Sequence, residues 1–221
     1  MMARLLAPLV QVVFPHQCRL CLELIVPEDV FCAVCLRKVQ PIVSAYLPVT
    51  KTIHLPVIGL SAYTDPLRQL VLKKFNGDRL ASEQLARLLL QLSPLATIPV
   101  DVVVPVPLHW TRYAWRGFNQ AVEMARVIAR GKGARVCSCV MRKRKTSFQS
   151  RLKAAERQNN VRGAFGIHPW YRLRGMDGIR GKHVLIVDDL CTTGATLVQV
   201  AKILLPHKPA SITAVVACRA V

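Results

Sequence analysis

Apolar residues along the chain fall into short unbroken runs separated by longer stretches of helical periodicity. A short unbroken run predicts a strand buried on both faces of a parallel sheet, and an apolar repeat near 3.6 residues predicts an amphipathic helix. The runs predict strands at residues 57–63, 101–104, 136–141, 184–187 and 211–218. The periodic stretches predict helices at residues 66–74, 80–92 and 195–205, and one that ends near Ala129. Because strands and helices alternate, the sequence predicts an α/β fold, a parallel sheet flanked by helices.

Two segments interrupt this alternation. Pro41 and Pro48 predict a linker over residues 41–56. Residues 142–165 are too hydrophilic for a core and predict a mobile basic loop or flap. Such a flap can exclude water from a diphosphate site, and a track for a nucleic-acid backbone is an equally good interpretation.

Two carboxylates, Asp188 and Asp189, follow the apolar run at residues 184–187. A loop that is rich in hydroxyl groups then leads into the next helix through Thr192, Thr193, Gly194, Ala195 and Thr196. Ligands of open α/β sheets bind outside the carboxyl ends of the strands, and backbone N–H groups at a helix N-terminus favour a phosphate. Because acids beside a phosphate would repel it, they need ribose hydroxyls or a hydrated Mg²⁺ as partners. The alternative is an ordinary strand-to-helix turn capped by threonine.

Basic residues follow two other predicted elements. Arg112 and Arg116 lie four residues apart, after the rigid turn at residues 105–108, and offer forked donors to a pyrophosphate. A solvent-facing arginine pair is the alternative. Lys74, at a predicted helix C-terminus, either approaches a ligand phosphate or only complements the helix dipole.

Four of the eight cysteines form two C-x2-C pairs, Cys18 with Cys21 and Cys32 with Cys35. This spacing predicts a tetrahedral, structural Zn²⁺ site, and disulfides are the competing interpretation. The chain is therefore divided into residues 1–45, an N-terminal segment with a four-cysteine zinc knuckle, and residues 46–221, the main domain.

The net charge is +19, and residues 130–182 contain 15 basic residues against two acids. A field of this kind favours polyanions, although charge runs often form only a solvated face. Trp170 and Tyr171 can stack on bases or pack internally. The apolar run at residues 1–14 is broken by Pro8 and Gln11 and lacks a cleavage site, so we expect a cytoplasmic protein without a membrane span.

The segment at residues 183–196, HVLIVDDLCTTGAT, resembles the phosphoribosyl-diphosphate (PRPP) loop of type I phosphoribosyltransferases. Further motifs make the chain similar to the ComF family along nearly its whole length. These motifs are Phe14-Pro15, the four cysteines, Lys74-Phe75, Gly77-Asp78, PVPLH at residues 105–109, RGFNQA at residues 116–121, Thr146, Gln149, Leu152, Arg157, Asn160-Val161 and Gly163-Ala164-Phe165.

The resemblance implies a type I phosphoribosyltransferase-like sheet in which Asp188 and Asp189 hold the ribose hydroxyls and residues 192–196 hold the 5-phosphate. As a transferase, the protein would bind PRPP with Mg²⁺ and use Asp188, Asp189, Arg112 and Arg116 as catalytic residues. Arg112 and Arg116 would bind the diphosphate together with Lys74. Bacterial members of the family are associated with uptake of transforming DNA. The sequence leaves two hypotheses open: a phosphoribosyltransferase with an unidentified acceptor, or a non-catalytic competence protein that binds a nucleotide or single-stranded DNA and works with DNA-uptake proteins.

Overall fold

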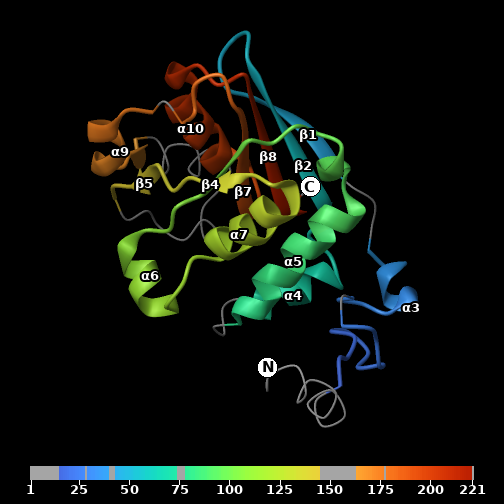
Figure 1. Cartoon of the computed structure of the whole chain (residues 1–221). Helices are drawn as coiled ribbons and strands as arrows, with labels where there is room; N and C mark the ends of the chain where they lie inside the picture. Colours follow the sequence, from blue (N-terminus) through green and yellow to red (C-terminus); the bar gives the residue numbers. More distant parts are fainter. Residues whose placement is uncertain are drawn as a thin grey trace, which may run out of the picture.

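A six-stranded sheet forms the centre of the computed structural model, which describes residues 15–27, 29–39, 43–73, 78–144, 163–176 and 178–220 (Figure 1). The strand order is β1-β2-β8-β7-β3-β4. The strands are β1 (Val43–Pro48), β2 (His54–Ala62), β3 (Val102–Pro105), β4 (Arg135–Val136), β7 (His183–Cys191) and β8 (Ser211–Arg219). All pairs are parallel except β1 with β2. The predicted α/β fold with a parallel sheet is confirmed.

Helices cover both faces of this sheet. The helices are α3 (Ala33–Leu36), α4 (Leu67–Lys73), α5 (Arg79–Leu92), α6 (Trp110–Arg116), α7 (Gln120–Lys132), α9 (Pro169–Arg174) and α10 (Ala195–Leu204), with 3-10 turns at Pro94–Ala96 and Leu205–His207. Side chains of α4, α5 and α7 share one core with Leu185 and Val187 of β7, whereas α10 shares the other core with Val184 and Ile186. A central strand with both faces covered must be apolar at every position, which explains the unbroken run.

Three expectations about local structure are wrong. The predicted linker at residues 41–56 contains β1 and the start of β2, which form an antiparallel hairpin. The predicted strand at residues 136–141 is divided between β4 and β5 (Val140–Arg142), and β5 pairs with β6 (Phe165–Ile167) outside the main sheet. The helix predicted to end near Ala129 is preceded by a separate helix, α6, because Gly117 (φ 75°) ends α6 in the left-handed conformation.

The N-terminal cysteine segment packs onto the main domain beside α4 and α5 (Figure 1). Cys18 and Phe31 belong to the same buried cluster as Leu67 and Leu70 of α4. The boundary predicted between residues 45 and 46 lies inside β1, and the division into two domains stays a prediction. Within the described ranges, no helix is long and apolar enough to cross a membrane.

Candidate functional site

β7 carries the acid pair to the carboxyl edge of the sheet. The Val106 N–H, just after β3, donates to the Val187 carbonyl at 2.9 Å, so the end of β3 lies beside the start of the pair. β7 continues to Cys191, which places Asp188 and Asp189 within the strand rather than after it. Both acids are half-buried, and Asp188 Oδ1 accepts a hydrogen bond from the Asp189 N–H at 2.9 Å. The acids are thus held at the edge where open α/β sheets bind ligands.

The hydroxyl-rich loop joins β7 directly to the N-terminus of α10. Gly194 is the N-cap of α10 with φ 74°, and no side chain from this position caps the helix. Thr193 Oγ1 accepts from the Ala195 N–H at 3.5 Å. A Cβ atom at Gly194 would lie 2.2 Å from Leu47 Cδ1, so β1 packs against this turn. The backbone N–H groups of the first turn of α10 therefore favour an anion near the acid pair.

Arg219 is a charged residue near this site that the sequence interpretation missed. It ends β8 in register with Cys191, and its Nε atom is buried without a hydrogen-bond partner in the described part of the chain. Burial raises the pKa of the Cys191 thiol to about 11; the charge of Asp188 adds to this increase, and the charge of Arg219 opposes it. Asp188 and Arg219 thus lie near one thiol. The sequence does contain a signal for Arg219, because this charged residue directly follows the apolar run of the last predicted strand.

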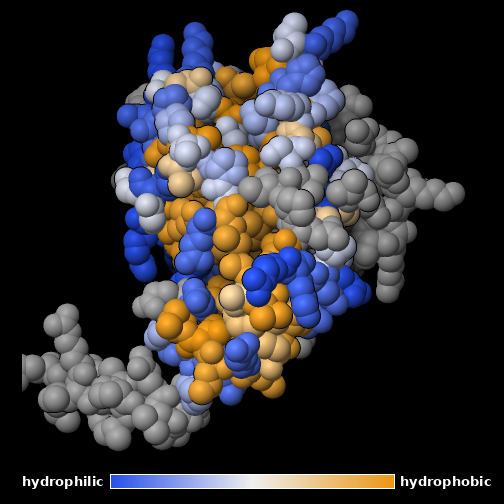
Figure 2. Space-filling model, turned by 90° about the vertical axis from the view of Figure 1, so that its right-hand side faces the viewer, coloured by the Kyte–Doolittle hydropathy of each residue, from blue (hydrophilic) through white to orange (hydrophobic). Residues whose placement is uncertain are grey.

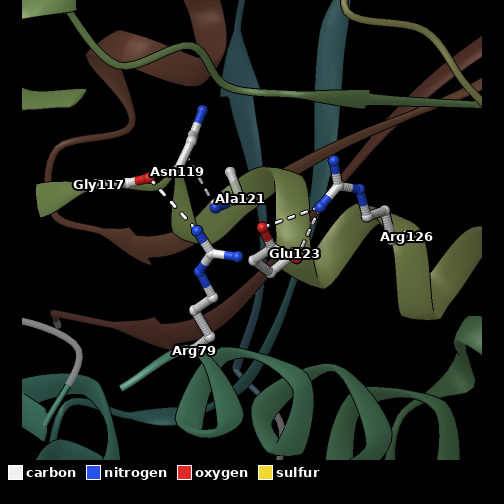
Figure 3. A network of polar contacts seen from close by, with 6 residues as sticks. All are labelled: Arg79, Gly117, Asn119, Ala121, Glu123 and Arg126. Atoms are coloured by element: carbon white, nitrogen blue, oxygen red, sulfur yellow. Dashed lines mark hydrogen bonds and ion pairs between the residues drawn. The ribbon is translucent and has the colours of Figure 1, made fainter. Parts of the chain in front are cut away.

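The loop after β3 returns to the same edge through the N-terminus of α7 (Figure 3). Asn119 donates from Nδ2 to the Val106 carbonyl at 3.0 Å and accepts from the Ala121 N–H at 3.1 Å. From α5, Arg79 donates to the Gly117 carbonyl at 3.5 Å and lies over the Phe118 ring at 5.4 Å. These contacts fix the α6–α7 connection beside the end of β3.

The residues predicted to bind diphosphate are only partly described. Arg112 and Arg116 both lie on α6, whose N-cap is the buried His109, but their side chains lie outside the described part. Lys74 and the motif residues from Thr146 to Val161 also lie outside the described residues. The predicted roles of Lys74, Arg112 and Arg116 stay predictions.

The four N-terminal cysteines converge on one point. Their Sγ atoms all lie within 4.8 Å of one another, and those of Cys21 and Cys32 are 3.6 Å apart. Four thiolates at about 2.3 Å from one Zn²⁺ would be separated by roughly 3.8 Å, so the arrangement fits a tetrahedral ion. Although burial opposes ionisation, backbone N–H groups of Cys21 and Cys32 lower the pKa of Cys18 to about 6. The cluster can hold a metal ion.

A second thiol pair lies after β4. Hydrogen bonding with the Cys139 thiol is the main reason that the pKa of Cys137 falls to about 6, and Tyr171 contributes to the decrease. Cys139 is fully buried, whereas Cys137 is half-buried. These two residues have no metal-ligand spacing, and Tyr171 of α9 packs against them rather than standing free for bases.

Arg19 connects the cysteine cluster to α5. It donates from Nε to Gln84 Oε1 at 3.0 Å, and its guanidinium lies 3.9 Å from the carboxylate of Asp78. Asp78 is the N-cap of α5 and accepts from the Ala81 N–H at 3.1 Å. Arg79, which contacts the α6–α7 connection, is the next residue. The cysteine cluster and the carboxyl edge of the sheet are therefore joined through the first turn of α5.

Three kinds of comparison show which known proteins this chain is similar to. The phosphoribosyl transferase domain family matches residues 112–220, from α6 to the end of β8. The DNA utilization protein YhgH of Salmonella typhi is 33% identical over 230 residues, which cover 93% of this chain and 97% of that protein. Competence protein F of Haemophilus influenzae is 28% identical over 156 residues, or 67% of this chain and 66% of that protein. A solved structure of the allosteric regulatory enzyme of purine biosynthesis has 19% identity and a TM-score of 0.41, over 62% of this chain and 25% of that one.

The fold and the matched domain define a phosphoribosyltransferase-like protein with a cluster of four cysteines at its N-terminus. Similarity to YhgH extends over nearly the full length of both proteins. The chain belongs to the ComF family, as its similarity to relatives named for competence and for DNA utilization shows. The predicted membership is confirmed.

Proposed function

We propose that this protein binds PRPP, or a related ribose 5-phosphate ligand, at the carboxyl edge of β7. Asp188 and Asp189 bind the ribose hydroxyls, and residues 192–196 bind the 5-phosphate through backbone N–H and hydroxyl groups. One observation carries the proposal: the half-buried acid pair and the N-terminus of α10, which lacks a side-chain cap from its N-cap residue, are joined by a short turn at one sheet edge. The domain match at residues 112–220 supports it.

The diphosphate of PRPP would meet the basic residues of neighbouring elements. Lys74 and the two arginines of α6, Arg112 and Arg116, are the candidates. A Mg²⁺ ion bound with PRPP would neutralise part of the diphosphate charge. In a transfer reaction the C1–O bond breaks, diphosphate leaves with the electron pair, and an acceptor forms the new bond to C1 and loses a proton. The arginines would stabilise the leaving group, because positioning and charge neutralisation supply most of the rate in such a step.

Ligand binding is tested by thermal unfolding with PRPP and Mg²⁺. A ligand at 100 times its Kd adds about 2.7 kcal/mol, and for a chain of this size that raises Tm by roughly 5–11 °C. The combined Asp188→Asn and Asp189→Asn substitutions should abolish the increase while Asp29→Asn, an exposed acid in the cysteine segment, should leave it unchanged. No stabilisation of the wild type by PRPP or by ribose 5-phosphate would contradict the proposal.

Binding of PRPP does not by itself imply catalysis. A second candidate function is therefore non-catalytic binding of a nucleotide or of single-stranded DNA during uptake of transforming DNA. The excess of positive charge at residues 130–182 favours this function, as do the relatives named for competence and DNA utilization. Release of pyrophosphate from PRPP with a panel of acceptors decides between the two. Release that is lost in Asp189→Asn supports transfer, whereas PRPP binding without turnover of any acceptor supports the binding protein.

The cluster of four cysteines is proposed to hold a structural Zn²⁺. No fifth ligand belongs to the cluster among the described residues, and three of its four cysteines are buried, which suits a structural rather than a catalytic metal. Zinc thiolates persist where thiols stay reduced, so we place the protein in the cytoplasm, where DNA-uptake proteins are the expected partners.

A further inference from the structure

Two adjoining depressions lie at the amino-terminal edge of the sheet, remote from the acid pair. Their volumes are about 340 and 210 Å³, and both are lined by Met176 and His207. Lys143 and Arg172 line the larger one, and Arg180 and Lys208 line the smaller. No acidic side chain lines either depression within the described part of the chain.

The four cations that line the depressions receive no counter-charge from the residues that the structure describes. Among these residues none of the four forms an ion pair, unlike Arg19 with Asp78 or Arg126 with Glu123. Clustered like charges repel one another, so their proximity is unfavourable unless an anion binds between them. Two adjoining sites of positive charge suit an anion with successive charged groups better than a single phosphate.

The backbone at Lys208 supports a role for its side chain. Lys208 has φ 52° and ψ 55°, a left-handed conformation that glycine or asparagine adopts at lower cost than lysine. Two backbone hydrogen bonds hold Lys208 in this conformation. Its N–H donates to the Leu205 carbonyl at 3.0 Å, and its carbonyl accepts from the Gly181 N–H at 2.9 Å. These bonds fix Lys208 next to the segment that carries Arg180.

Aromatic side chains flank the same surface. Trp170 on α9 is 53% exposed and is the candidate for stacking, whereas Tyr171, which lines the larger depression, packs against Cys137 and Cys139. Cations combined with aromatic rings are typical of surfaces that bind single-stranded nucleic acid, because phosphates pair with the cations and bases stack on the rings.

We propose that these depressions bind the phosphate backbone of a single-stranded nucleic acid at a site distinct from the ribose-phosphate pocket. β8 separates the two, since Lys208 precedes its first residue and Arg219 ends it opposite Cys191. Nine residues of parallel strand span roughly 26 Å. A strand on the depressions and a ligand at the acid pair therefore bind at the same time. This site rests on the second candidate function, binding of single-stranded DNA, and does not depend on PRPP binding.

The test measures anisotropy of a labelled oligothymidine of about 20 nucleotides at several salt concentrations. Arg172→Glu with Arg180→Glu should weaken binding roughly tenfold or more and lower the salt slope by about 1–2. Arg68→Glu with Arg126→Glu makes the same change in net charge at exposed positions of α4 and α7, and should weaken binding far less. Circular dichroism melting of both double variants establishes that they are folded.

Further measurements distinguish this site from other sites and other ligands. Oligoribonucleotide should bind like oligothymidine, and saturating ribose 5-phosphate should leave the affinity unchanged. An equal loss of oligothymidine affinity in the two double variants would show that binding depends only on net charge, and would overturn the proposal. Stronger binding of duplex DNA, competition by ribose 5-phosphate, or loss only in Trp110→Ala with Trp115→Ala, the exposed tryptophans of α6, would also overturn it.

Discussion

Replacing Gly194 by alanine tests the turn that leads into α10. The residue has φ 74°, a conformation that costs an L side chain about 1–2 kcal/mol. Alanine also lowers the conformational entropy of the unfolded chain, which stabilises the folded protein by about 0.4–1 kcal/mol. The new Cβ would lie 2.2 Å from Leu47 Cδ1, well inside the roughly 3.5–4.0 Å of a carbon contact. Leu47 is half-buried on the edge strand β1 and can move, so the overlap costs about 1 kcal/mol, the low end for overpacking.

The expected net destabilisation of Gly194→Ala is about 2 kcal/mol, which for this size lowers Tm by roughly 4–8 °C. Thermal unfolding without ligand measures it. The same substitution in a Leu47→Ala background removes the overlap, so the further decrease relative to Leu47→Ala should be about half as large. An unchanged Tm, or equal decreases in both backgrounds, would refute the reasoning about strain and overlap.

Three further predictions concern the cysteines and their surroundings. Arg19→Ala should lower Tm by roughly 2–4 °C, since it removes a hydrogen bond worth about 1 kcal/mol, and elemental analysis should find the metal content unchanged; a loss of metal would contradict this. Iodoacetamide should alkylate Cys137 at a rate that is nearly constant from pH 7 to 9 and falls as pH drops through about 6, because its thiolate is stabilised in the folded protein. Peptide mass spectrometry measures this, and a rate that still rises tenfold above pH 7.5 would count against it. Finally, one zinc per chain should be lost in Cys35→Ser, with a lower Tm; a metal-free wild type with an unchanged melt would exclude a structural zinc.

Sequence reasoning succeeded where the signal is local. The run before Asp188 predicted a central strand because each face of β7 meets a covered layer, and the spacing of the cysteines predicted their convergence, since each C-x2-C pair forms one turn. The acid pair and the hydroxyl-rich loop are contiguous in sequence, so their proximity needed no knowledge of the tertiary structure. Their role in binding a ligand stays a prediction.

The missed features depend on distant contacts. β1 has little strand pattern of its own and forms because β2 offers a free edge, and Leu47 reaches Gly194 only when that hairpin packs beside α10. Arg219 and Cys191 are 28 positions apart in the chain and become neighbours through strand register. The break between β4 and β5 follows from the pairing of β5 with β6, which a single run of apolar residues cannot reveal.

The shared core beneath the cysteine segment has a consequence for the lifetime of the protein. Hydrophobic side chains gather on the lower part of the face in Figure 2. In the cysteine segment, Leu22, Leu24, Val26 and Val34 are already exposed. If the proposed zinc were lost and the segment detached, Cys18, Val30 and Phe31, which are buried in the core cluster shared with α4 and α5, would also become exposed to water. Chaperones and proteases act on such surfaces, so the abundance of the protein in the cell should follow the supply of the metal.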